Sequence, residues 1–159
     1  MKPKRPQILE EIHQGKPLHS RTQEAFLGLM RTANVVDRKF EAVVAPAGVS
    51  GQQYNVLRIL RGAGKEGLPT LEVASRLVEQ TPGITRLLDR LEKKKWIRRE
   101  RCPSDRRQVL CWITPEGLAL LARLDGPVAD FDRHALGMLT AAEQRELVRI
   151  LDKVRREGS

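Results

Sequence analysis

The chain has 159 residues, of which 40% are hydrophobic and 4% aromatic, and its formal net charge is +9 with a pI near 10.1. This length suits one domain with an aliphatic core, and the basic balance favours a polyanionic partner, either nucleic acid or an anionic membrane surface. Two cysteines are too few for a disulfide framework, and no apolar run approaches the roughly 18 residues of a membrane span. We therefore expect a soluble cytoplasmic protein without a membrane span, and of the two polyanionic partners we expect nucleic acid and no membrane.

The first part of the chain predicts an arm and a long helix. Residues 1–19 mix Pro, Lys and Gln and are expected to form a flexible arm. From Ser20 to Val44, apolar residues recur every three or four positions, which is the period of one helical face. Pro46 and Gly48 are expected to end this helix.

Two shorter helices are predicted next. One starts near Ser50 and ends at the glycine-rich loop 62–67. Thr70 is expected to cap the other, whose inward residues are Leu71, Val73, Ala74 and Leu77.

A third short helix, predicted at about residues 81–94, is strongly amphipathic. Thr81 and Pro82 form a helix-start signal, with a capping hydroxyl followed by proline at the first helical position. Its apolar stripe consists of Ile84, Leu87, Leu88 and Leu91, and its opposite face carries Thr85, Arg86, Asp89, Arg90 and Lys93. Two short helices joined by a tight turn, the second basic, predict a helix-turn-helix.

After this helix the hydrophobic period changes to two. Residues 97–102 and 108–113 are predicted strands, joined by a turn at Pro103, Ser104 and Asp105. A hairpin that follows a recognition helix is a wing, here at about residues 97–113. Thr114 before Pro115 starts another helix, and Thr140 with Glu143 three residues later predicts the capping box of the last one.

Positive charge is concentrated on the predicted recognition helix and wing. Residues 86–107 contain ten bases against four acids, so +6 of the total +9 lies within this segment. A merely solvated surface is the alternative explanation, but such surfaces usually mix the two signs more evenly.

Three segments resemble the MarR family of bacterial transcriptional regulators. Residues 81–92 (TPGITRLLDRLE) are similar to that family's recognition helix, Asp105-Arg106-Arg107 to its wing signature, and residues 113–117 (ITPEG) to the exit from the wing. The sequence departs from the family at Lys95, where glycine is usual, and in the turn 78–80, which lacks glycine. In a left-handed backbone Lys95 would carry a strain of about 1 kcal/mol.

The resemblance, which covers residues 20–156, implies a mainly helical winged helix-turn-helix with dimerisation helices at both ends of the chain. We expect a dimerisation helix at 20–48, a DNA-binding lobe at 49–114 and C-terminal dimerisation helices at 115–159. The dimer contacts are assigned to six apolar residues of the terminal helices: Phe26, Leu29, Leu147, Ile150, Leu151 and Val154.

The DNA contacts are expected on the recognition helix and the wing. Base contacts are assigned to Thr81, Gly83, Thr85 and Arg86, with Arg86 gripping guanine. Alternatively Thr81 only caps the helix and Arg86 binds phosphate. Asp89 is expected to orient Arg86 or Arg90. Phosphate contacts are assigned to Arg90, Arg98 and Arg99.

The wing tip is expected to reach the minor groove through Arg107, because narrow minor grooves concentrate negative potential. By resemblance, Asp105 pairs with an arginine to hold the hairpin, although an ordinary turn residue remains the alternative. Arg106 is expected to neutralise phosphate.

The sequence therefore predicts a homodimeric regulator, in particular a repressor, that binds a pseudo-palindromic double-stranded DNA site. The resemblance also implies a small-molecule effector that releases the DNA. A winged-helix module that binds protein is the alternative function. The spacing of residues indicates no enzyme, no cofactor and no metal site: His13, His19 and His134 are scattered, and a helix is expected before the GxGxxG letters of the loop 62–67.

Cys102 and Cys111 raise the further hypothesis of an oxidant sensor. In the expected hairpin register Cys102 faces Gln108 and Cys111 faces Arg99, which puts the thiols beyond disulfide reach. The arginines around Cys102 are expected to lower its pKa.

Overall fold

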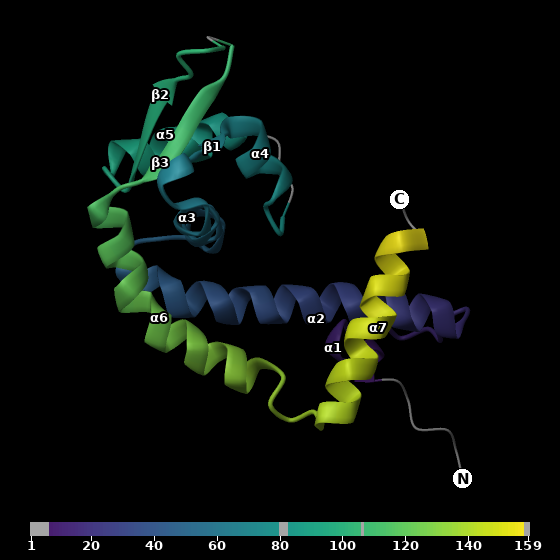
Figure 1. The fold of residues 1–159 in the computed structure, drawn as a ribbon. Helices are drawn as coiled ribbons and strands as arrows, with labels where there is room; N and C mark the ends of the chain where they lie inside the picture. Colours follow the sequence, from purple (N-terminus) through teal and green to yellow (C-terminus); the bar gives the residue numbers. More distant parts are fainter. Residues whose placement is uncertain (1–6, 80–82, 106, 158–159) are drawn as a thin grey trace. The chain divides into compact units, whose positions relative to one another are not determined.

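The computed structural model describes residues 7–79, 83–105 and 107–157 (Figure 1). The described residues are mainly helical and include one small antiparallel sheet, which confirms the predicted fold class. The elements in chain order are α1 (Gln7–Glu11), α2 (Arg21–Val44), η1 (Ala45–Ala47), α3 (Gly51–Ala63), η2 (Gly64–Glu66), β1 (Leu68–Pro69), α4 (Thr70–Ser75), α5 (Ile84–Lys93), β2 (Ile97–Arg101), β3 (Val109–Ile113), α6 (Pro115–Ala135) and α7 (Ala141–Glu157). They form two compact units, residues 1–42 and 43–159.

The first unit contains α1 and most of α2. The hydroxyl of Ser20 accepts a hydrogen bond from the Gln23 backbone N–H at 3.1 Å, so α2 starts where the sequence predicts. The side chains of Phe26 and Met30 are 59% and 57% exposed. A helix with large apolar side chains in water has a face suited to a partner.

The second unit is built around α3 and α6. Ser50 and Gln53 form a complete capping box at the start of α3. The largest fully buried side chains here include Leu57 and Leu60 of α3 and Leu120 and Leu121 of α6. No helix among the described residues is both long enough and apolar enough to cross a membrane.

The sheet has the strand order β1-β3-β2, and both pairings are antiparallel. Arg99 pairs with Cys111, and the Cys102 N–H donates to the Gln108 carbonyl at 2.9 Å, as the predicted register requires. β1 was not predicted, because two residues are too few to show a strand period. Its Leu68 pairs with Cys111 on the other side of β3.

The structure corrects three details of the predicted helix-turn-helix. Thr70 does not cap α4, because its hydroxyl donates to the Val109 carbonyl at 3.2 Å. Leu71 does not face inward and is 81% exposed, whereas Val73 is buried. α5 begins at Ile84, later than the predicted Thr81, because Gly83 occupies the N-cap with φ of 110°. Thr81 and Pro82 lie outside the described residues.

The end of the recognition helix α5 is tied to the start of α6. Lys95 has φ of 60°, the left-handed backbone that the missing family glycine suggested. The Thr114 hydroxyl donates to the Lys95 carbonyl at 2.7 Å and accepts from the Gly117 N–H at 3.1 Å, which confirms Thr114 as the cap of α6. A Cβ atom on Gly117 would lie 2.3 Å from the Trp96 carbonyl oxygen, so glycine is required at this contact.

The Lys95→Gly variant is expected to raise the free energy of unfolding by up to about 1 kcal/mol, because glycine adopts this backbone without strain. Urea unfolding at one protein concentration measures the change. Lys93→Gly removes the same charge from the exposed last turn of α5 and is the matched control. It should instead lower the free energy by about 1 kcal/mol. Changes of the same sign would contradict this account.

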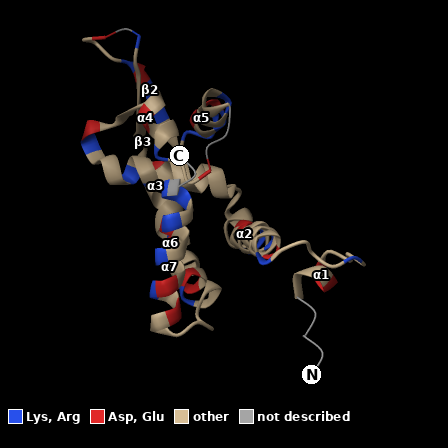
Figure 2. Cartoon of the chain, turned by 90° about the vertical axis from the view of Figure 1, so that its right-hand side faces the viewer, with Lys and Arg blue, Asp and Glu red and all other residues tan. Residues whose placement is uncertain are grey.

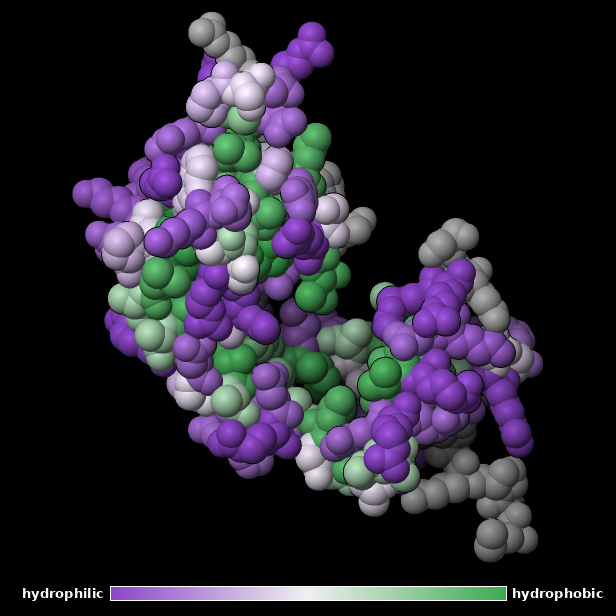
Figure 3. Space-filling view, in the orientation of Figure 1, coloured by the Kyte–Doolittle hydropathy of each residue, from purple (hydrophilic) through white to green (hydrophobic). Residues whose placement is uncertain are grey.

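α7 begins at the predicted capping box. The Thr140 backbone N–H donates to Glu143 at 2.8 Å, and the Glu143 N–H donates to the Thr140 hydroxyl at 3.3 Å. Ile150 and Val154 are 45% and 54% exposed, and Figure 3 shows apolar surface beside the charged side chains of this helix. Like α2, α7 therefore has an apolar stripe that its own unit leaves in water.

Candidate nucleic-acid interface

The recognition helix α5 has one buried and one exposed face. Leu88 and Leu91 are fully buried and hold the helix on the core. Thr85, Arg86 and Arg90 are exposed, and Thr85 and Arg86 lie in the first turn, directly after Gly83. In a helix-turn-helix, these N-terminal turns are the part that reaches base edges. The structure therefore brings together the described residues to which base contacts were assigned.

The hairpin turn is held by Asp105. Its carboxylate accepts hydrogen bonds from the Arg107 backbone N–H at 3.0 Å and from the Gln108 side-chain amide at 3.2 Å. This local contact with the backbone is typical of turn residues, which is the alternative that the sequence left open for Asp105. Arg107 is exposed beside it, and Arg106 lies outside the described residues.

Arg99 joins the recognition helix to the wing. Its guanidinium donates to Glu92 at 3.0 and 2.6 Å and to Asp89 at 2.5 Å, and its side chain is only 18% exposed. The hydrogen bond with Glu92 is the main cause that raises the pKa of Arg99. Asp89 therefore pairs with Arg99, whereas the sequence predicted that it would orient Arg86 or Arg90. This ion-pair network was missed because the partners come from two different elements.

Arg98 lies on the opposite face of β2 from Arg99, since neighbouring strand residues alternate. Its guanidinium lies 4.1 Å from the centre of the Trp112 ring and also pairs with Glu100. Figure 2 shows further basic positions on α5 and along the hairpin. Arg98 and Arg99 were both predicted to contact phosphates, but only Arg98 is exposed, whereas Arg99 is paired with two carboxylates of α5.

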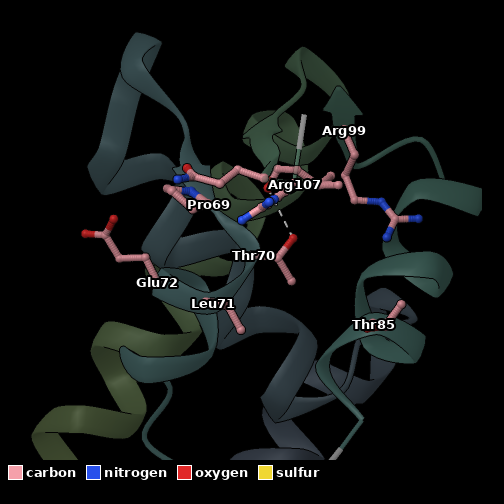
Figure 4. Close-up of a pocket in the computed structure, with 9 residues that line it drawn as sticks. Pro69, Thr70, Leu71, Glu72, Thr85, Arg99 and Arg107 are labelled. Carbon is pink, nitrogen blue, oxygen red and sulfur yellow. Dashed lines mark hydrogen bonds between the residues drawn. The ribbon is translucent and has the colours of Figure 1, made fainter. Parts of the chain in front are cut away.

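A groove of about 560 Å³ separates the recognition helix from the wing (Figure 4). Thr85 of α5 lines one side, Arg107 and Gln108 of the hairpin line another, and Thr70 and Leu71 of α4 also contribute. The α4 residues of this groove are not predicted from the sequence, because its pattern places Leu71 in the core. A period of four from Val73 to Leu77, both buried, could have shown that Leu71 belongs to another face.

The two cysteines lie in different environments: Cys111 is buried in β3, and Cys102 is partly exposed beside the hairpin turn. Burial raises the pKa of Cys111, and a hydrogen bond with the Ser104 hydroxyl lowers the pKa of Cys102. The expected direction for Cys102 is confirmed, but its cause is the turn hydroxyl and not the arginines.

A basic helix of a helix-turn-helix beside a hairpin wing defines a winged-helix protein of the DNA-binding class. The sequence model of the MarR family matches residues 49–109. The multiple antibiotic resistance protein MarR of Salmonella typhimurium is 33% identical over 119 residues, which cover 74% of this chain and 81% of that protein.

Solved structures that resemble this chain also belong to MarR-type regulators. A MarR transcription factor from Planctomyces limnophilus is 40% identical, with a TM-score of 0.66 over 86% of this chain and 98% of that one. Sco3205, a MarR family transcriptional regulator from Streptomyces coelicolor solved in complex with DNA, is 25% identical, with a TM-score of 0.80 over 90% of this chain and 94% of that one. The chain belongs to the MarR family. It is a DNA-binding transcriptional regulator and not an enzyme.

Proposed function

We propose that the protein is a homodimeric repressor that acts in the cytoplasm on a pseudo-palindromic operator. The observation that carries the proposal is the position of Thr85 and Arg86 at the exposed start of α5, with Arg107 across the groove. A helix start and a wing arginine can contact the major and the adjacent minor groove together. By the family resemblance, a small-molecule effector would release the DNA.

The side chains in this surface have different tasks. Arg86 would read guanine through two hydrogen bonds, and Thr85 would contact a neighbouring base or a thymine methyl. Arg90 and Arg98 would neutralise phosphates, which gives affinity without sequence preference. Arg99 already pairs with two carboxylates, so its task is to hold α5 against β2, and not to bind phosphate.

The exposed apolar stripes of α2 and α7 support the proposed dimer. Phe26 and Leu29 of α2 and Ile150 and Val154 of α7 are all at least 41% exposed, and Leu147 and Leu151 are half-buried beside the last two. Covering these side chains with a second copy would remove apolar surface from water. Two-fold symmetry would then place two recognition helices about one DNA turn, ~34 Å, apart.

Selection of bound sites from random DNA duplexes tests the proposal. We expect a two-fold symmetric consensus, with affinity that falls steeply as salt is added, because each neutralised phosphate releases counterions. The control is the consensus duplex with one half-site scrambled. If no sequence is enriched at low salt, the proposed function is wrong, and a winged-helix module that binds protein becomes the better account.

A further inference from the structure

The connection between α4 and α5 is anchored by side chains of α3. The backbone N–H of Val78 donates to the Asn55 side-chain oxygen at 3.0 Å, and the Gln52 side-chain amide donates to the Glu79 carboxylate at 2.8 Å. Gln52 and Asn55 are three residues apart on α3, so they share one helical face. Two residues on the same face of α3 thus hold two consecutive residues of the connection.

The anchor holds the backbone of Val78, while the side chain of this residue lies in water. Val78 is 91% exposed, whereas Leu77 before it is buried and donates its N–H back to Ala74 at 3.3 Å. α4 ends at Ser75, so this hydrogen bond belongs to the turn in which the chain leaves that helix. The direction in which it leaves is fixed by a hydrogen bond to a residue 23 positions earlier.

The anchor lies just before the residues proposed to read DNA. Glu79 is four positions before Gly83, and Thr85 and Arg86 lie in the first turn of α5. The sequence of residues 78–82 contains no glycine, and Gly83, whose φ is 110°, follows as the N-cap of α5. A shift of the connection would move the start of α5. Hydrogen bonds to base edges would then be misaligned, because they form only within narrow limits of distance and angle.

We propose that Asn55 is a positioning residue for base recognition: through its hydrogen bond to the Val78 N–H it sets where the start of the recognition helix lies. Asn55 does not itself contact DNA in this proposal. The inference rests on the proposed function, since it concerns the discrimination between operator and other sequences. Gln52 supports the same connection through Glu79.

Two variants of nearly equal size test the role. Asn55→Leu keeps the shape and removes the hydrogen-bond acceptor, and Asn55→Asp keeps an acceptor oxygen. The readout is the ratio of affinities for the selected operator and for a scrambled duplex at one salt concentration. We expect Asn55→Leu to lower this ratio on the order of tenfold, since each half-site loses one anchoring hydrogen bond. Asn55→Asp should weaken binding to both duplexes alike and keep the ratio.

Hydrogen exchange separates positioning from loss of folding. The Val78 amide should exchange faster in Asn55→Leu and stay protected in Asn55→Asp, while the amides of the buried part of α5 stay protected in both. Gln52→Leu is a second variant that leaves the Asn55 contact in place and should lower the ratio less. An unchanged ratio in Asn55→Leu, or an equal loss in Asn55→Asp, would overturn the inference. A wild-type protein without sequence preference would instead overturn the proposed function, and this inference with it.

Discussion

Replacement of Leu147 or Ile150 by Asp is expected to give monomers that no longer hold the operator. Both residues belong to the apolar stripe of α7, and Ile150 is 45% exposed in the single chain. A carboxylate inside an apolar interface would be desolvated without a partner, which costs several kcal/mol per copy. A monomer would also lose the second half-site, and linked sites commonly gain about 10²- to 10⁴-fold in affinity over single ones.

Light scattering gives the oligomeric state, and titration of the selected duplex gives the affinity. Leu147→Met is the matched control, because it keeps an apolar side chain of similar volume and should leave both measurements unchanged. An Asp variant that stays dimeric would place the interface elsewhere. One that becomes monomeric but keeps full affinity would contradict the need for two half-sites.

Arg86→Ala is expected to abolish the preference for one base pair in each half-site. A bidentate arginine–guanine contact contributes about 1–3 kcal/mol of discrimination, and a dimer would lose two such contacts. Affinity for the operator should therefore fall by about two orders of magnitude, with little change for operators that already lack that base pair. Repeating the duplex selection with the variant shows which position of the consensus becomes degenerate.

Arg98→Ala is the matched control for Arg86→Ala, since it removes the same charge from the wing. The Arg98 guanidinium pairs with Glu100 and lies over Trp112, so its loss should weaken all sequences slightly and alike. If Arg86→Ala also weakened all duplexes alike, Arg86 would be a phosphate contact, which is the alternative left open by the sequence.

Periodic features of the fold were predictable from the sequence, and contacts between elements were not. The apolar stripe of α2 and the alternation in β3 predicted both elements, because burial follows a period of 3.6 or 2. The start of α5 was placed too early because Thr81 and Pro82 look like a cap, whereas Gly83 takes that position. A capping sequence reports only local preference, which tertiary contacts can override.

The candidate site shows the same division. The exposure of Thr85 and Arg86 could be predicted, because they lie away from the apolar stripe of the helix. The role of Arg99 could not, because Glu92 and Asp89 meet it only after β2 packs on α5. The hydrogen bond from Val78 to Asn55 could not be predicted either. The turn at residues 78–80 lacks glycine in the sequence, but no sequence pattern links this turn to a residue of α3.

The bridge formed by Arg99 also affects the electrostatic potential in front of α5. Asp89 and Glu92 are acidic residues of the helix that we propose faces DNA, where a free carboxylate would repel phosphates. Arg99 acts as their internal counterion and lowers the net charge of this cluster from −2 to −1, which reduces its repulsion of an approaching phosphate. The potential that a phosphate meets there is then set mainly by the basic side chains of the helix. In the proposed complex, this one largely buried arginine would thus make the helix more attractive to DNA without touching it.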